Sequence, residues 1–247
     1  EHKVYTQGDD IRYLDWNVFA KTDRFHIKKF EDETNIRVEI VLDQSNSMNF
    51  ASDTNKQTKF NYTISLVAAL SYLSLKQGDA VGLSFFANGL NHRHPPRSSG
   101  SYLLELLTSL VNATTGDKTD IAESLNELGR QLKRKSVIIV LSDLFSSSQE
   151  LMVATKNLVA RGHDVAFMQI LHPAEIEFPY DRPATFTSME DDRELFIHPK
   201  ILQKTYQKQL KKFLQETEKK IIASGARYQT VNTATEPSQT LRVFLNH

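Results

Sequence analysis

The 247-residue sequence contains no cysteine, which excludes disulfides, thiolate catalysis and cysteine-based zinc or iron–sulfur sites. An excess of charge of one sign is also missing. The chain has 30 basic residues (Lys and Arg) and 30 acidic ones, so we expect no general attraction to nucleic acid or to an anionic membrane. No apolar run approaches the roughly 20 residues that cross a bilayer, and no signal peptide is recognisable. The lack of cysteine fits a reducing compartment, and we expect a cytoplasmic protein with no membrane segment in this chain.

Several diagnostic motifs are absent as well. The sequence has no Walker A loop, no GxGxxG and no GxSxG nucleophile elbow. The segment Asp43-Gln44-Ser45 is only superficially like the DxD nucleophile of aspartyl-phosphate hydrolases, because Ser45 stands where the second acid is required. These absences give no support to a common enzyme class.

Apolar runs alternate with amphipathic segments from residue 36 onward. This pattern predicts strands at 36–42, 80–87, 137–141, 165–171 and 228–231. It predicts helices at 59–77, 101–112, 120–134, 148–161 and 199–224, with a short helix at the end of the chain. We expect Gly78, Gly162 and Gly225 to cap three of these helices at their C-termini. Strands that alternate with helices indicate an α/β fold: a doubly wound, mostly parallel sheet with helices on both faces.

Three segments depart from the alternation. Residues 1–35 are polar and aromatic, and we interpret them as an irregular arm that packs on the core and holds one short strand near 25–30. Residues 91–100 read as a basic loop. Prolines and two short β-like pieces at 173–198 predict a hairpin insertion in the main domain at 36–247. The sequence begins at Glu1 in the middle of a pattern, which indicates a piece of a longer protein.

Polar side chains follow two of the predicted strands. Asp43 ends the strand at 36–42, and Ser45 and Ser47 come next at a spacing of two. Asp143 ends the strand at 137–141, and Thr119 lies in the loop before the helix at 120. Ligands of open α/β sheets bind just beyond the carboxyl ends of the strands, so we expect these five side chains to converge.

The five side chains suit a hard cation. Mg²⁺ prefers six oxygen ligands and keeps several waters, and Mn²⁺ or Ca²⁺ could take its place. The hydroxyls of Ser45, Ser47 and Thr119 can bind the ion directly, while Asp43 and Asp143 balance its charge. One position would stay open to an oxygen from outside. A plainer interpretation is that Ser and Asp residues after a strand form turns and helix caps.

The order DxSxS, Thr, Asp resembles the metal-ion-dependent adhesion site of von Willebrand factor A (VWA) domains, and all five positions match. The segment Gly8–Trp16 is similar to the GDDxRxxDW signature of the bacterial domain-of-unknown-function family fifty-eight. Similarity extends through 20–25, 30–35, 97–99, 161–165 and 175–179 and covers nearly the whole chain. The sequence looks most like the short, soluble branch of that family. Gln44 and Asn46 are a mild departure, since small residues are more usual at those positions.

The resemblance implies a VWA-like fold and work beside an AAA+ ATPase of the MoxR type in complex assembly or maturation. We therefore expect a metal-dependent protein-interaction module, not an enzyme, whose metal binds a carboxylate of the MoxR-type ATPase or of its client. The alternative is a metal-dependent hydrolase that uses Asp43 and Asp143. A hydrolase also needs a positioned base, and Asp120 is the only nearby candidate.

Two further features have alternative interpretations. His92 and His94 could touch a metal, but a solvated basic loop explains them better because no third ligand is evident. The acids, Arg12 and Trp16 of the N-terminal signature could form a recognition surface, or Trp16 could simply pack the arm onto the sheet.

Overall fold

The computed structural model describes residues 2–4, 18–19, 24–28, 36–52, 56–87, 89–116, 120–145, 149–190 and 193–246. Contacts divide the chain into two units, Glu1–Asn35 and Ile36–His247. In the first unit, β1 (His2–Val4) pairs antiparallel with β2 (His26–Lys28), within the strand predicted near 25–30. The Gly8–Trp16 signature lies outside the described residues.

The second unit is built on a six-stranded sheet with the order β10-β7-β6-β3-β4-β5. Five of its strands run parallel: β3 (Arg37–Asp43), β4 (Ala80–Ala87), β6 (Val137–Ser142), β7 (Asp164–Leu171) and β10 (Arg227–Asn232). Each of these strands coincides with a predicted one. The expectation of an α/β protein with a mostly parallel sheet is therefore confirmed.

The sixth strand, β5 (Gly89–Arg97), corrects the prediction of a basic loop at 91–100, which was wrong. β5 pairs antiparallel with β4 at the edge of the sheet, with two shifts of register. An edge strand forms ladder hydrogen bonds on one side only, so Pro95 and Pro96 are tolerated there. Its basic residues also have a use, since Arg93 Nη2 lies 2.7 Å from the buried carboxylate of Glu39 on β3. The strand was not predicted because its edge position and its ion pair cannot be recognised from the local sequence pattern.

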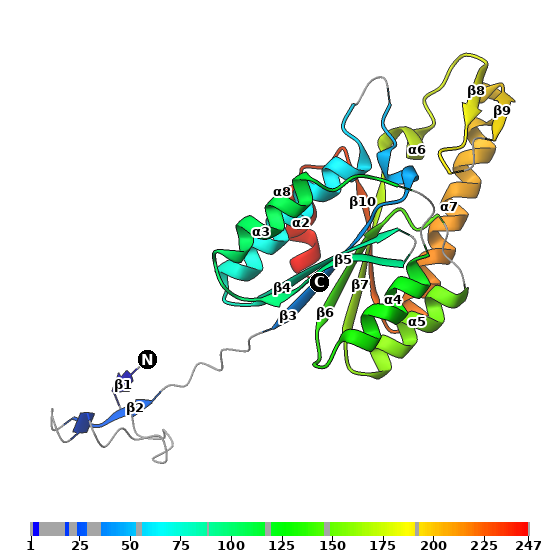
Figure 1. The fold of residues 1–247 in the computed structure, drawn as a ribbon. Coiled ribbons are helices and arrows are strands. Elements are labelled where there is room, and N and C mark those ends of the chain that lie inside the picture. The colour runs from blue at the N-terminus through cyan, green and yellow to red at the C-terminus, as the bar shows by residue number, and fades with distance from the viewer. Residues whose placement is uncertain are drawn as a thin grey trace. The chain divides into compact units, whose positions relative to one another are not determined.

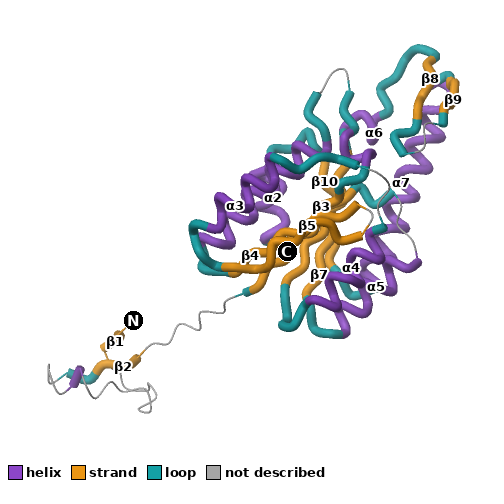
Figure 2. Tube along the Cα trace, viewed as in Figure 1, coloured by secondary structure: helices purple, strands orange, loops and turns teal. Residues whose placement is uncertain are grey.

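Helices cover both faces of the sheet (Figure 1). One face carries α2 (Lys59–Lys76), α3 (Tyr102–Val111) and α8 (Pro237–Leu245), over a core that includes Ile40 and Leu66. The other face carries α4 (Ile121–Gln131), α5 (Gln149–Ala160) and α7 (Pro199–Ala223), over a core that includes Val140 and Leu125. Figure 2 shows the sheet in orange between these two layers of purple helices. The near-continuous apolar strands thus follow from burial on both faces.

The region 173–198 contains a short helix, α6 (Pro173–Glu177), and a hairpin of β8 (Ala184–Thr187) and β9 (Glu194–Ile197). The predicted hairpin is therefore confirmed. The three expected capping glycines have positive φ, with values of 86° at Gly78, 84° at Gly162 and 85° at Gly225, so that prediction is also confirmed. In the part of the chain that the structure describes, no helix has the length and apolarity needed to cross a membrane.

The strand order explains where a site should form. After β3 the chain builds β4 and β5 on one side, and then returns to build β6, β7 and β10 on the other side of β3. β3 and β6 therefore flank the point at which the direction of strand order reverses. Crevices at such a point, outside the carboxyl ends of the strands, are the usual ligand sites of open α/β sheets.

Candidate metal site at the carboxyl ends of β3 and β6

The DxSxS turn begins at the last residue of β3. Oδ1 of Asp43 accepts a hydrogen bond of 2.8 Å from the backbone N–H of Ser45. The hydroxyls of Ser45 and Ser47 lie 3.0 Å apart, where the chain enters a short 3₁₀-helix, η2 (Asn46–Asn49). Asp43 is 1% exposed and Ser45 is 5% exposed. The turn therefore gathers one carboxylate and two hydroxyls at a nearly buried point.

The end of β6 adds a second carboxylate. Leu42 of β3 is in register with Leu141 of β6, and the hydroxyl of Ser142 donates a hydrogen bond to Oδ2 of Asp43. Asp143 follows directly and is 3% exposed. The next residue, Leu144, has a φ of 57°, a conformation that non-glycine residues adopt at a cost of about 1–3 kcal/mol. Such strain persists only where the surroundings hold the chain firmly, and it occurs here beside the candidate site.

The fifth expected side chain, Thr119, lies outside the described residues. The chain that leads towards it is fixed to the DxSxS turn. Gly116 donates its N–H to the carbonyl of Gln44 at 2.7 Å, and Gln44 Nε2 donates to the carbonyl of Thr114 at 2.9 Å. Ser45 and Gly116 also form an isolated parallel bridge. The structure thus brings Asp43, Ser45, Ser47 and Asp143 to one edge of the sheet, with residues 114–116 against the same turn.

Lys59 is the main residue that the sequence prediction missed. It begins α2, is fully buried, and places Nζ 2.8 Å from Asp143 Oδ2 and 2.7 Å from Glu175 Oε1. Burial alone would lower the pKa of Lys59, but the charges of Asp143 and Glu175 outweigh it and raise the pKa, so the side chain stays protonated. A signal was present in the sequence, because the helical period places Lys59 on the same stripe as Leu66 and Leu70, which are buried.

Glu190 is a second missed residue. It lies beyond β8 in the hairpin, and its Oε1 accepts a hydrogen bond of 3.0 Å from the backbone N–H of Ser47. A carboxylate from a segment 143 residues away therefore already reaches the DxSxS turn. No local pattern could have revealed this contact, since it depends on how the hairpin folds back over the sheet edge.

The site carries an excess of negative charge. Burial, together with the neighbouring charge of Asp143, raises the pKa of Asp43 to about 6, although hydrogen bonds from Ser142 and Ser45 act in the opposite direction. A cation beside these carboxylates would relieve both effects, because it offsets the lost hydration and the repulsion.

The donor set fits a hard cation. Mg²⁺ and Ca²⁺ prefer oxygen ligands, and the carboxylates and hydroxyls at this edge all present oxygen. Within the described ranges, no group of three or more His, Asp or Glu side chains is placed to hold a metal, so a histidine-type transition-metal site finds no support there. His94 instead faces Glu105 at 3.3 Å and Ser109 at 2.9 Å through its two ring nitrogens, and the side chain of His92 lies outside the description.

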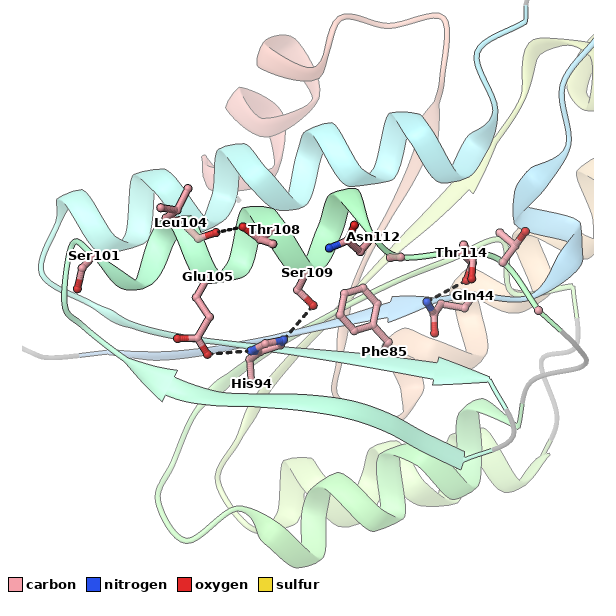
Figure 3. Close-up of a pocket in the computed structure, with 13 residues that line it drawn as sticks. Gln44, Phe85, His94, Ser101, Leu104, Glu105, Thr108, Ser109, Asn112 and Thr114 are labelled. Carbon is pink, nitrogen blue, oxygen red and sulfur yellow. Dashed lines mark hydrogen bonds and ion pairs between the residues drawn. The ribbon is translucent and has the colours of Figure 1, made fainter.

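A groove of about 900 Å³ extends from the DxSxS turn along α3 (Figure 3). One end is formed by Gln44 and residues 113–116, and Phe85 lines the middle. His94 and Glu105 face each other further along, beside the α3 side chains. The groove is lined by the aromatic ring of Phe85 together with hydroxyl and amide groups.

Taken together, the fold and the site define an α/β protein with an oxygen-rich cluster at its strand-order reversal. The chain belongs to the protein family of unknown function DUF58, which matches residues 1–216. Uncharacterized proteins of Mycobacterium bovis and Mycobacterium tuberculosis are 26% identical to it over 183 residues, which is 72% of this chain. The chain spans 56% of the length of these relatives.

Solved structures share the fold. An aerotolerance-related membrane protein of Bacteroides fragilis matches with a TM-score of 0.57 at 18% identity, over 84% of this chain and 96% of that one. The conserved hypothetical protein BatB of Bacteroides thetaiotaomicron matches with a TM-score of 0.55 at 18% identity, over 84% of this chain and 95% of that one. At such low identity the likeness concerns the fold alone.

Proposed function

We propose that this chain is a VWA-type, metal-dependent protein-interaction module. The observation that carries the proposal is the gathering of Asp43, Ser45, Ser47 and Asp143 at the carboxyl edge of β3 and β6. The tie between residues 114–116 and the DxSxS turn adds support for Thr119 as the fifth member.

In this proposal the hydroxyls of Ser45, Ser47 and Thr119 hold Mg²⁺, or Mn²⁺ or Ca²⁺, and the two aspartates hold its waters and balance its charge. The bound cation would supply an electrophilic position for an oxygen from another protein. The three groups that would touch the metal directly are neutral hydroxyls, so the ion itself stays electrophilic towards the carboxylate of an incoming Asp or Glu.

An acidic partner is supported by Glu190, whose carboxylate binds the turn at Ser47 N–H. The partner's carboxylate would approach the same edge, and its neighbouring residues would lie in the groove beside Phe85. The family resemblance suggests that the partner is a MoxR-type AAA+ ATPase or its client. The loops after residues 43, 87, 114 and 143 would frame the contact.

Binding of a purified MoxR-type ATPase to the immobilised chain, measured in Mg²⁺ and in EDTA, tests the proposal. Affinity should fall at least about tenfold in EDTA, which corresponds to about 1.4 kcal/mol. Asp43→Ala should reproduce that loss in Mg²⁺. Asp181→Ala is the matched control, because Asp181 is 81% exposed and pairs with Lys200. Equal binding by Asp43→Ala and the parent chain in Mg²⁺ would refute the proposed role of the metal.

A further inference from the structure

Lys59 is a fully buried ammonium beside the candidate metal site. Two of its three N–H groups point at carboxylates, Asp143 at 2.8 Å and Glu175 at 2.7 Å. Aromatic rings complete its surroundings, with Nζ 5.1 Å from the centre of Phe145 and 5.9 Å from that of Phe50. Both rings face the cation at distances at which the attraction between a positive charge and an aromatic face is significant.

This position is unfavourable for a lysine in two ways. Burial removes the hydration of the ammonium, which is costly unless partners replace it. The first turn of a helix also carries the positive end of the helix dipole, which disfavours a cation. Replacing all members of a buried ion-pair cluster by apolar groups is often neutral or stabilising, so packing alone does not require a charge at this position of α2. What Lys59 supplies to Asp143 and Glu175 is its positive charge.

Glu175 is fixed as firmly as Lys59. It stands at the third position of α6, and its Oε2 accepts the backbone N–H of His172 at 2.7 Å, as part of a capping box. Its other oxygen, Oε1, is the one that meets Lys59. Asp143 is held in a similar way, with Oδ2 on Lys59 and Oδ1 accepting from the N–H of Phe145 at 3.3 Å. Lys59, held in turn by Glu175, therefore helps to fix the orientation of the Asp143 carboxylate.

The charged side chains around the site leave an excess of negative charge. Asp43, Asp143, Glu175 and Glu190 carry four negative charges when ionised, and Lys59 carries one positive charge, so three negative charges remain. A divalent cation would offset two of them. Without Lys59 the excess would be four, and without the charge of Glu175 it would be two.

We propose that Lys59 and Glu175 are positioning residues that orient Asp143 and set the net charge of the metal site, and thereby its affinity for a divalent cation. This inference rests on the proposed function. One unit charge within a few ångströms of a divalent ion changes the binding constant by more than tenfold, even at an effective dielectric constant of about 20.

The test is titration calorimetry of the full chain with Mn²⁺ alone, in low salt at neutral pH. Glu175→Gln should weaken the dissociation constant at least about tenfold, and Lys59→Met should tighten it at least about tenfold. Glu177→Gln is the matched control, since Glu177 is an exposed residue of the same short helix, and its affinity should equal that of the parent.

The outcomes separate the two proposals. Suppose that the parent chain binds Mn²⁺, that Asp43→Ala abolishes this binding, and that Glu175→Gln binds Mn²⁺ as tightly as the parent. The metal site then stands, and the proposed role of Lys59 and Glu175 is overturned. If the parent chain takes up no Mn²⁺, the proposed function itself fails, and this inference fails with it. Should Lys59→Met not fold, Glu175→Gln alone decides, because its expected effect has a defined sign and a control.

Discussion

Replacing Lys59 by methionine should destabilise the fold strongly. The substitution keeps the length of the side chain but removes its charge, and it leaves Asp143 and Glu175 without their shared partner. Lys59 is fully buried, and side-chain exposure is 5% at Asp143 and 13% at Glu175, so water can replace little of the lost interaction. Breaking a buried pair from one side costs about 3–5 kcal/mol. That is a large part of the 5–15 kcal/mol by which domains are typically stable.

Urea unfolding of the parent and of Lys59→Met in EDTA at pH 7.5 measures this cost. With a slope of about 2–3 kcal/mol per molar urea, the midpoint should fall by roughly 1–2 M. Lys76→Met, in the exposed last turn of the same helix, should stay within about 0.5 kcal/mol of the parent. Adding Glu175→Gln to Lys59→Met should recover part of the loss, since one uncompensated charge is removed. A loss below about 1 kcal/mol for Lys59→Met would show that the ammonium is not the buried partner of these carboxylates.

Three further predictions concern stability. Asp43→Asn should raise the free energy of unfolding in EDTA at pH 7.5 by about 1–3 kcal/mol. The reason is that burial and the charge of Asp143 raise the pKa of Asp43 to about 6, so the ionised carboxylate is destabilising at this pH. An unchanged free energy of unfolding would contradict this. Burial lowers the pKa of His163, whose Nδ1 accepts from Ser136 N–H, so its stabilising contribution is complete above about pH 6.5 and is lost as the pH falls below it. Urea unfolding at pH 7.5 and 5.5 should show a smaller pH effect in His163→Asn than in the parent, and an equal effect contradicts this. Gly162→Val should cost about 1–2 kcal/mol because φ is 84°, with Mn²⁺ affinity unchanged; a change in that affinity would show that the cap reaches the site.

The fold could be predicted from the sequence where a local pattern reports burial. The strand β6 and the second half of β3 are continuously apolar because both faces of the sheet are covered. The ends of the two strands at Asp43 and Ser142 fall within a residue or so of the predicted ends. β5 escaped prediction for the opposite reason. It lies at an edge, and its basic and proline-rich sequence satisfies contacts with β4 and Glu39 that a local pattern cannot show.

The candidate site divides in the same way. Asp43, Ser45, Ser47 and Asp143 could be chosen in advance because strand ends on one sheet edge must converge. Lys59, Glu175 and Glu190 could not be assigned to the site, because they come from α2, α6 and the hairpin, whose approach to the edge is set by packing. The sequence thus predicts the residues carried by the sheet and misses those that later elements bring to it.

The central claim, that these residues form a divalent metal site, is tested most directly by calorimetric titration of Mn²⁺ into the parent chain and into Asp43→Ala. We predict that the parent binds a single Mn²⁺ and that saturating metal, at about 100 times its dissociation constant, stabilises the fold by about 2.7 kcal/mol. Asp43→Ala should show neither the heat of binding nor the stabilisation, while Asp181→Ala should show both. Equal Mn²⁺ binding by the parent and by Asp43→Ala, or no binding by either, would contradict the account.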